Sequence, residues 1–267
     1  MKKVVFTDLD GTLLDWSDYS YSQALSALEL LRGRGIPIVF CSAKTRVEQE
    51  AYREELGIKD PFIVESGGAI FIPRGYFPFT FNHHKTTKDY FVIELGISHQ
   101  KVREVLKRIE KEVGCNIKGF EDMNPEEIAL DTGLSLKFAS LAKQREYDEI
   151  FKIEDTQEKI EAVLDKIEEA GLTYGSGGRY YGAVCGNNKG KAIKILIELF
   201  GRKLGKIETI GIGDSQNDIS MLKAVDIPVL VQKSNGYWED VDLPGVYKVK
   251  GVGPLGWRRA VQELTGG

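Results

Sequence analysis

Short apolar runs alternate with longer helical repeats near the start of the chain. Residues 3–7 form an apolar-rich run that leads directly into the acidic segment DLDGT. Residues 22–32 place apolar side chains at helical spacing, and glycines end that repeat. A second apolar run occupies 36–40 and is followed by a polar segment and another helical stretch that reaches Leu56. The pattern predicts the order strand, helix, strand, helix.

The predicted strands, including a further one at 62–64, do not alternate between apolar and polar residues. Such continuous apolar runs are typical of parallel strands that helices cover on both faces. The same alternation returns after residue 188, with a helix at 191–200, a strand at 207–212, a helix at 219–224 and a strand at 227–231. The sequence therefore predicts an α/β fold with a Rossmann-like parallel-sheet core, built from residues 1–81 and 187–267.

The segment between these two halves has a different character. Prolines and glycines at 73–78 precede a strand-like DYFVIEL sequence. Its other predicted elements are amphipathic helices at 99–113 and 156–170 and a hairpin at 171–184. We predict that residues 82–186 form an inserted α+β cap domain. The segments at 73–78 and 182–190 are its candidate hinges.

Composition narrows the class of protein. Of the 267 residues, 42% are hydrophobic and 28% are charged, and the formal net charge is -4. No stretch approaches the roughly 20 apolar residues that a membrane span needs, and the N-terminus does not resemble a secretory signal. Three widely spaced cysteines indicate neither a disulfide framework nor a zinc site. We therefore expect a cytoplasmic protein with no membrane partner and, lacking a basic excess, no nucleic-acid partner.

Acidic residues follow two of the predicted parallel strands. Asp8 and Asp10 lie at the end of the first strand, and Asp214 and Asp218 follow the strand at 207–212. In open α/β sheets the carboxyl ends of the strands meet at one edge, where ligands bind. Taken alone, this motif would favour a simpler interpretation, with Asp8 as a helix cap and Asp10-Gly11 as a turn. Two acidic strand ends together favour a shared site instead.

Four segments, in this order, resemble the motifs of the haloacid dehalogenase superfamily: DLDGT at 8–12, Ser42, Lys189 and GDSQND at 213–218. The resemblance implies a phosphatase in which Asp8 attacks phosphorus and forms an aspartyl phosphate. Asp10 would protonate the leaving oxygen and then activate water. Ser42 and Lys189 would bind phosphoryl oxygens.

The same resemblance implies a magnesium ion. Its ligands would be the carboxylates of Asp8 and Asp214 and the main-chain carbonyl of Asp10. Asp218 would either bind the ion directly or support the residues that bind it. Hard oxygen donors of this kind suit Mg²⁺. Asn217 is a candidate for orienting the loop that carries these ligands.

The lysine assignment stays open at this point. Lys191 begins the same predicted helix as Lys189, and either side chain could reach inward. The KGxA context favours Lys189. The segment GNNKGKA is not a nucleotide-binding P-loop, because its glycine spacing is one residue short and Ala192 stands where Ser or Thr is required.

Further segments are similar to the family of mannosyl-3-phosphoglycerate phosphatases, namely SAKTR, ESGGAIF, REYDEIF, GGRYYG and GVGPLGW. Ser66 and Ile150 depart from that pattern. The resemblance implies a small phosphate ester as the partner, and Arg145 and Arg179 offer planar forks for its anionic groups. Lys44 and Asn217 complete the candidate substrate-binding set. Arg145 could instead pair with a neighbouring Glu on a cap surface.

Other substrates fit the same architecture, since the sequence does not reveal how a sugar hydroxyl is recognised. They are glucosyl-3-phosphoglycerate, sucrose phosphate, trehalose phosphate and hexose phosphates. A noncatalytic binding module with the same fold is a different class of hypothesis, but it would not need all four charged positions. No oligomeric state is predicted.

Overall fold

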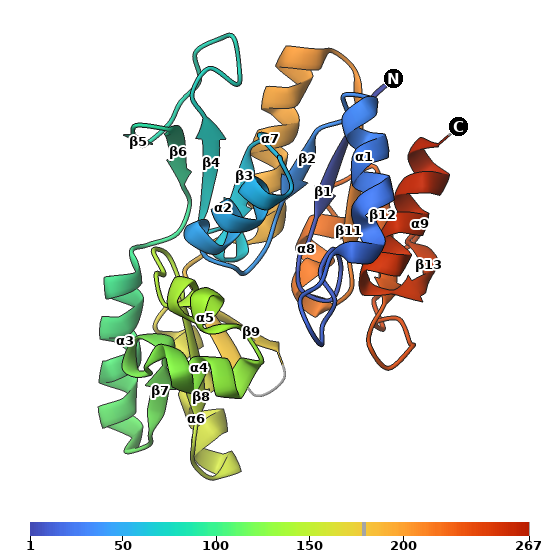
Figure 1. Ribbon diagram of the computed structural model, residues 1–267. Helices are drawn as coiled ribbons and strands as arrows, with labels where there is room; N and C mark the ends of the chain where they lie inside the picture. Colours follow the sequence, from blue (N-terminus) through green and yellow to red (C-terminus); the bar gives the residue numbers. More distant parts are fainter. Residues whose placement is uncertain (178–179, 267) are drawn as a thin grey trace.

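The computed structural model describes residues 1–177 and 180–266, which form two lobes (Figure 1). The larger lobe is built on a five-stranded parallel sheet with the order β13-β12-β11-β1-β2. Its strands are β1 (Lys2–Thr7), β2 (Ile38–Phe40), β11 (Ile207–Gly213), β12 (Ile227–Gln232) and β13 (Tyr247–Val252). The predicted Rossmann-like core is confirmed, with four of its strands close to the ranges read from the sequence. The strand β13 was not predicted, and the strand predicted at 62–64 lies in a different, antiparallel sheet.

Helices cover both faces of this sheet. They are α1 (Leu25–Gly33), α7 (Lys189–Leu204), α8 (Ile219–Leu222) and α9 (Gly253–Thr265). Val5 of β1 packs in one hydrophobic cluster with Leu28 and Trp257, whereas Val4 and Phe6 pack in another with residues of α7 and α8. Successive side chains of a strand point to opposite faces. Both faces of β1 are therefore buried, which explains its continuous apolar run.

A second, antiparallel sheet extends the larger lobe, in the order β3-β4-β6-β5. Its strands are β3 (Phe62–Val64), β4 (Ala69–Pro73), β5 (Lys85–Thr86) and β6 (Tyr90–Glu94), and α2 (Arg46–Glu55) packs beside it. A parallel bridge between Cys41 and Ile63 joins it to the end of β2. The predicted start of the cap at residue 82 falls inside this sheet. Residues 85–94 therefore belong with the larger lobe, because DYFVIEL pairs with β4.

The smaller lobe contains an antiparallel sheet in the order β7-β8-β10-β9. Its elements are β7 (Ile117–Gly119), β8 (Glu149–Ile153), β9 (Thr173–Gly177), β10 (Tyr180–Val184), α3 (His99–Val113), α4 (Pro125–Thr132), α5 (Leu136–Ala142) and α6 (Gln157–Glu169). Phe151 packs with α3 and α6, and its neighbour Ile150 packs with α4 and α5. The α+β character, the two amphipathic helices and the hairpin were all predicted. We call this lobe the cap.

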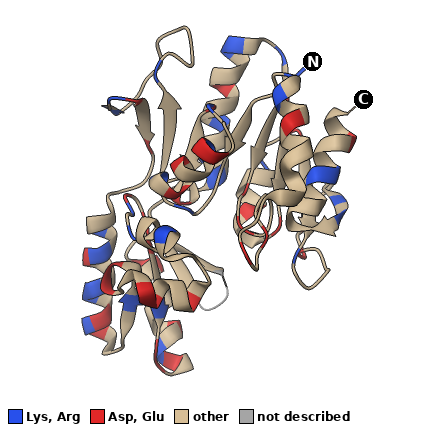
Figure 2. Ribbon diagram, in the orientation of Figure 1, with Lys and Arg blue, Asp and Glu red and all other residues tan. Residues whose placement is uncertain are grey.

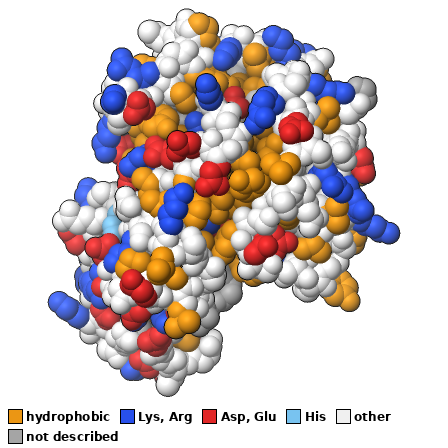
Figure 3. Space-filling view, viewed as in Figure 1, with side chains coloured by type: hydrophobic (Ala, Val, Ile, Leu, Met, Phe, Trp, Pro, Cys, Tyr) orange, Lys and Arg blue, Asp and Glu red, His pale blue; other side chains and the backbone are white. Residues whose placement is uncertain are grey.

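Short 3-10 helices lie at Ser22–Ala24, Glu65–Gly67, Phe120–Asp122 and Gln216–Asp218. Many positions along the cap helices are Lys, Arg, Asp or Glu (Figure 2). On the face in Figure 3, acidic and basic side chains mix over both lobes, and hydrophobic ones gather toward its middle. Among the described residues, no helix combines the length and apolar character needed to cross a membrane.

Candidate active site

Three carboxylates meet at the carboxyl edge of the parallel sheet. Asp8 directly follows β1 and Asp214 directly follows β11, and these strands pair in register, with Thr7 opposite Ile212. One oxygen from each of Asp8, Asp214 and Asp218 lies within 4.8 Å of the others, and all three residues are buried. The structure therefore brings together the acidic residues of both strand ends.

Lys189, the first residue of α7, lies between two of these carboxylates. Its Nζ is 2.6 Å from Asp8 Oδ1 and 2.7 Å from Asp218 Oδ1, and its side chain is 1% exposed. Lys191 is exposed, and its amine donates to the carbonyl of Gly186. Of the two candidate lysines, the structure places Lys189 against Asp8.

One ammonium does not balance three neighbouring carboxylates. Burial raises the pKa of Asp8 well above its ordinary value, although the charge of Lys189 opposes this effect. Burial and, secondly, the negative charge of Asp218 raise the pKa of Asp214 to about 7. Desolvation and like charges both disfavour ionised carboxylates. The cluster therefore has an excess of negative charge that a cation would offset.

The two carboxylates on the β11 side have different surroundings. Asp218 accepts from Lys189 through Oδ1, and its Oδ2 accepts from the backbone N–H groups of Asp214 and Ser215 at 3.0 and 3.2 Å. Asp214 Oδ1 accepts from the hydroxyl of Thr12 at 3.1 Å. Both oxygens of Asp218 are thus occupied by protein donors, and this carboxylate mainly organises the groups around it.

Asp10 is held by a neighbouring lysine. Lys44 Nζ is 3.0 Å from Asp10 Oδ1 and 3.4 Å from Glu48 Oε1, and it lies over the Tyr19 ring. Lys44 itself is buried, whereas the side chain of Asp10 remains 31% exposed. The predicted substrate-binding Lys44 is therefore directed at Asp10.

Ser42 follows β2 at the same edge. Its Oγ accepts a hydrogen bond from the backbone N–H of Lys44 at 3.2 Å. A hydroxyl has one donor and two acceptor sites, so Ser42 keeps its proton available for a ligand. Ser42 lines a cavity of about 540 Å³ together with Asp8, Asp10 and Asp214. Its lining includes Asp8, Asp10, Trp16, Ser42, Ser176, Asp214, Asn217 and Lys233.

A second cavity of about 300 Å³ adjoins the first and lies against the cap sheet. The two share Ala43, Ser176 and Asn217 as lining residues. Asn217 is exposed, and its Oδ1 accepts from the hydroxyl of Ser215. Asn187 lines the second cavity, and its buried amide atoms have no hydrogen-bond partner among the described residues. Ser176 lies in the predicted hairpin at 171–184 and Asn187 in the segment GNNKGKA, but neither was predicted as a site residue, because nothing in these local patterns distinguishes it.

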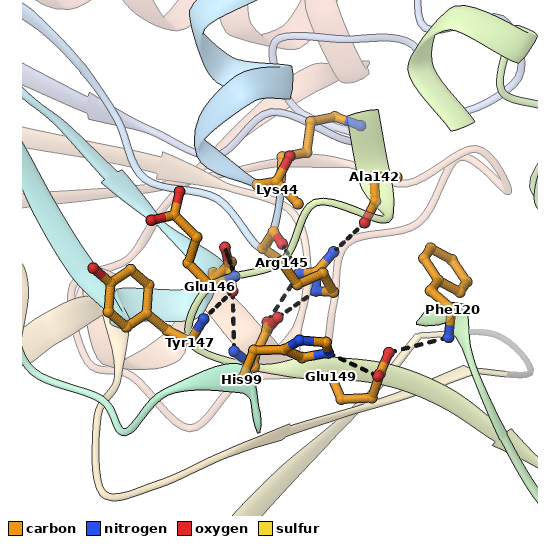
Figure 4. Close-up of polar contacts among 12 residues, drawn as sticks. Lys44, His99, Phe120, Ala142, Arg145, Glu146, Tyr147 and Glu149 are labelled. Carbon is orange, nitrogen blue, oxygen red and sulfur yellow. Dashed lines mark hydrogen bonds and ion pairs between the residues drawn. The ribbon is translucent and has the colours of Figure 1, made fainter. Parts of the chain in front are cut away.

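Of the two predicted substrate-binding arginines, Arg145 is not a lining residue of either cavity. Arg145 is buried beside Asp148, with its Nε and Nη2 atoms both donating to that carboxylate (Figure 4). The alternative prediction, that Arg145 pairs with a nearby carboxylate, is correct in kind. The partner is Asp148, however, and the pair is buried. Arg179 lies outside the described residues.

The core sheet and its acidic edge define the class of protein. Residues 5–237 match the family model described as haloacid dehalogenase-like hydrolase, and the chain belongs to this family.

Curated relatives narrow the comparison. A glucosyl-3-phosphoglycerate/mannosyl-3-phosphoglycerate phosphatase of Methanococcoides burtonii is 45% identical over 100% of this chain and 98% of its own. A mannosyl-3-phosphoglycerate phosphatase of Pyrococcus horikoshii is 41% identical over 86% of this chain and 91% of its own. The crystal structure of Thermoplasma acidophilum 0175 has a TM-score of 0.69 at 18% identity, covering 98% of both chains. That last likeness concerns the fold alone.

Proposed function

We propose that this protein is a magnesium-dependent phosphatase that hydrolyses mannosyl-3-phosphoglycerate to mannosylglycerate and phosphate. The observation that carries the proposal is the buried Asp8–Lys189 pair, in which Asp8 lines the same cavity as Asp10 and Ser42. The relatives with 45% and 41% identity support the substrate class. The small-molecule ester is the proposed partner, and the cytoplasm stays the predicted location.

Asp8 is the nucleophile in this proposal. Its carboxylate attacks phosphorus, the bond to the leaving oxygen breaks, and an aspartyl phosphate forms. Lys189 lies 2.6 Å from Asp8 Oδ1, so it offsets negative charge as an anionic phosphoryl group approaches. Water then attacks phosphorus, which releases phosphate and regenerates Asp8.

Asp10 is the general acid and base. It gives a proton to the leaving alkoxide in the first step and takes one from water in the second. The contact of 3.0 Å with Lys44 holds its carboxylate in place. Ser42 donates its hydroxyl proton to a phosphoryl oxygen, because its Oγ already accepts from the backbone of Lys44.

The residues present fit a hard divalent cation. The oxygens of Asp8, Asp214 and Asp218 lie within 4.8 Å of one another, and no His or Cys donor accompanies them in this cluster of described residues. We infer that Asp8 and Asp214 hold Mg²⁺ with their carboxylates and Asp10 with its carbonyl, while Asp218 supports them from behind. When bound, the ion supplies positive charge that stabilises the phosphoryl oxygens.

The cap is proposed to select the organic part of the substrate. The second cavity lies between Lys189 and the strands β9 and β10. It adjoins the cavity over the carboxylates, so an ester whose phosphate occupies the first cavity would extend into the second. Ser176 and Asn187 are polar lining residues there, and a polar sugar fits such a lining.

Glucosyl-3-phosphoglycerate is a second candidate substrate. The Methanococcoides burtonii relative is described as acting on both glycosyl phosphoglycerates, and it aligns with the whole of this chain. Mannose and glucose differ in the orientation of one hydroxyl, so acceptance of both would require a site that does not depend on that group.

A phosphate-release assay over a panel of esters tests the proposal. The panel contains mannosyl- and glucosyl-3-phosphoglycerate, 3-phosphoglycerate, sucrose phosphate, trehalose phosphate, a hexose phosphate and para-nitrophenyl phosphate, each with Mg²⁺. The highest kcat/KM is expected for a glycosyl phosphoglycerate. Folded Asp8→Asn protein is the inactive control. Preference for another sugar phosphate would overturn the substrate, and turnover by Asp8→Asn would overturn the nucleophile.

A further inference from the structure

Three consecutive carbonyls of the Ser42–Lys44 segment are held from outside. Ser42 O accepts from the N–H of Ser66 at 3.0 Å, and Lys44 O accepts from the N–H of Glu65 at 3.1 Å. Between them, Ala43 O accepts from Arg145 Nη2 at 2.6 Å. This segment carries Ser42 and also Lys44, whose amine contacts Asp10. Lys44 O also accepts from the side chain of Gln49 at 3.1 Å, which belongs to the core, whereas the side chain that holds the middle carbonyl comes from the cap.

The guanidinium of Arg145 is held by protein acceptors. Its Nε and Nη2 donate to the two oxygens of Asp148, and Nη1 donates to the carbonyl of Ala142 at 3.3 Å. Burial disfavours a charged guanidinium, but the carboxylates of Asp148 and Glu65 outweigh burial and raise its pKa above the ordinary value. The group is therefore a fixed cation, with four hydrogen bonds to protein acceptors.

Glu65 fastens the cap segment that carries Arg145. Its carboxylate accepts from the backbone N–H groups of Glu146, Tyr147 and Asp148 at 3.0, 2.6 and 3.0 Å (Figure 4). Glu65 is completely buried and has a left-handed backbone, with φ of 48°. Such a conformation is costly for a residue with a side chain, and it persists where surrounding contacts fix it.

We propose that Arg145 is a positioning residue for Ser42 and Asp10, acting through the Ala43 carbonyl. The inference rests on the proposed roles of Ser42 and Asp10 in phosphate transfer. Because Arg145 belongs to the cap and the Ser42–Lys44 segment to the core, the seating of the cap and the geometry of the phosphate site are linked. In this proposal Arg145 holds Ser42 and Asp10 in position and does not bind the carboxylate of the substrate.

The proposal depends on the forked shape of the guanidinium. Arg145 spans from Asp148 to Ala43 O with one planar group, whereas the ammonium of lysine is compact and has no such fork. Arg145→Lys keeps the positive charge near Asp148 but cannot keep both contacts in place. A shift of the Ser42–Lys44 segment by a fraction of an ångström affects every ester, because Ser42 and Asp10 act on the phosphate and its leaving oxygen.

Arg145→Lys is compared with wild type and with Arg53→Lys as the matched control. Arg53 is also buried, but its guanidinium lies over the Phe62 ring, 4.2 Å from the centroid, and donates to the carbonyl of Asp60. The measurements are kcat and KM for a glycosyl phosphoglycerate and for para-nitrophenyl phosphate, the inhibition constant of inorganic phosphate, and Tm. Rates refer to the folded fraction.

For Arg145→Lys, kcat is expected to fall by about 10- to 100-fold on both esters, and phosphate should inhibit less strongly. Arg53→Lys should lower Tm without either kinetic effect. Asp148→Asn, which keeps the shape of Arg145's partner, should show the same kinetic changes to a smaller extent. Asp148→Asn also tests the proposal if the Arg145→Lys variant does not fold.

Two results would overturn the assignment. If only the glycosyl phosphoglycerate suffers, Arg145 contacts the substrate. If Arg145→Lys and Asp148→Asn resemble Arg53→Lys, with altered Tm but unchanged kcat and phosphate inhibition, the cluster is structural. Failure of the proposed substrate is distinguishable, because it would appear in wild type, while the comparison on para-nitrophenyl phosphate and inorganic phosphate stays readable.

Discussion

Lys189 and Asp8 form a buried ion pair of 2.6 Å between residues that are 181 positions apart in the chain. The pair joins the N-terminus of α7 to the end of β1, so the two chain segments on either side of the cap must come together to create it. The same lysine contacts Asp218, which makes it the cation that permits two carboxylates to be buried here.

Lys189→Met should therefore impair both stability and activity. Removing one partner of a buried pair leaves uncompensated charge, at a cost of about 3–5 kcal/mol in the free energy of unfolding. Loss of a charge at the phosphate should lower kcat by at least about 100-fold. Denaturant unfolding and phosphate release measure the two effects. Lys191→Met, at an exposed position of the same helix, is the control and should change neither.

Asp10→Asn should discriminate between esters by their leaving groups. A sugar-linked alkoxide needs a proton as it departs, whereas para-nitrophenolate leaves without one. We expect kcat to fall by about 100- to 10,000-fold for the glycosyl phosphoglycerate and much less for formation of the aspartyl phosphate from para-nitrophenyl phosphate. Rapid-quench measurement of the first step resolves this contrast. Equal losses on both esters in that step would remove Asp10 from leaving-group protonation.

The acidic edge of the site was predictable because it follows from topology. Asp8 and Asp214 end strands whose apolar runs indicate burial, and parallel strands bring their carboxyl ends to one edge. The residue spacing did not decide between Lys189 and Lys191, since both begin the helix. Their burial decides it, and burial depends on how α7 packs on the sheet.

The hydrogen bonds that join the cap to the core around the site were not predictable in the same way. Arg145 donates to Ala43 O, 102 positions away, and Glu65 binds backbone groups 81 to 83 positions away. A local pattern does not encode such partners. The segment DYFVIEL was predicted as a strand, but the pairing of Tyr90–Glu94 with β4 depends on a chain reversal through residues 74–89, part of which was predicted as a hinge of the cap.

Magnesium binding should depend on pH through Asp214. Its pKa of about 7 in the folded protein is above the ordinary 3.8, so the folded state holds this proton more tightly than the unfolded state. In the absence of metal, the stabilising contribution is full at low pH and is lost as pH rises through about 7. Mg²⁺ competes with the same proton, so its affinity should increase from about pH 6 to about pH 8.

Thermal unfolding with and without Mg²⁺ across this range measures that competition. The rise in Tm on adding Mg²⁺ should be larger at the higher pH. Chelation should abolish activity, and Mg²⁺ should restore it. Asp214→Asn has no titrating group and should flatten the pH dependence while weakening the metal's effect. A Tm shift that is independent of pH in wild type would contradict the assignment of Asp214 as a ligand.

Gly67→Ala tests how closely the segment after Glu65 supports Lys189. Gly67 has φ of +96°, and a Cβ there would lie 2.4 Å from the backbone carbonyl of Asn188 and 2.9 Å from the N atom of Lys189. The start of α7 would have to move. We expect a loss of about 3 kcal/mol or more in the free energy of unfolding, from backbone strain and overpacking together.

Gly133→Ala is the control that separates backbone strain from displacement of the start of α7. Gly133 also has positive φ, +77°, but its Cβ would meet nothing within 4 Å, so only about 1 kcal/mol of backbone strain is expected and kcat should be unchanged. In Gly67→Ala, the displaced Lys189 should additionally lower kcat for every ester, since its distance of 2.6 Å to Asp8 depends on the position of its own backbone. Denaturant unfolding and the rate of the folded fraction on para-nitrophenyl phosphate distinguish these effects. If the two variants lose equal stability and both keep full kcat, the close approach at Gly67 does not position Lys189.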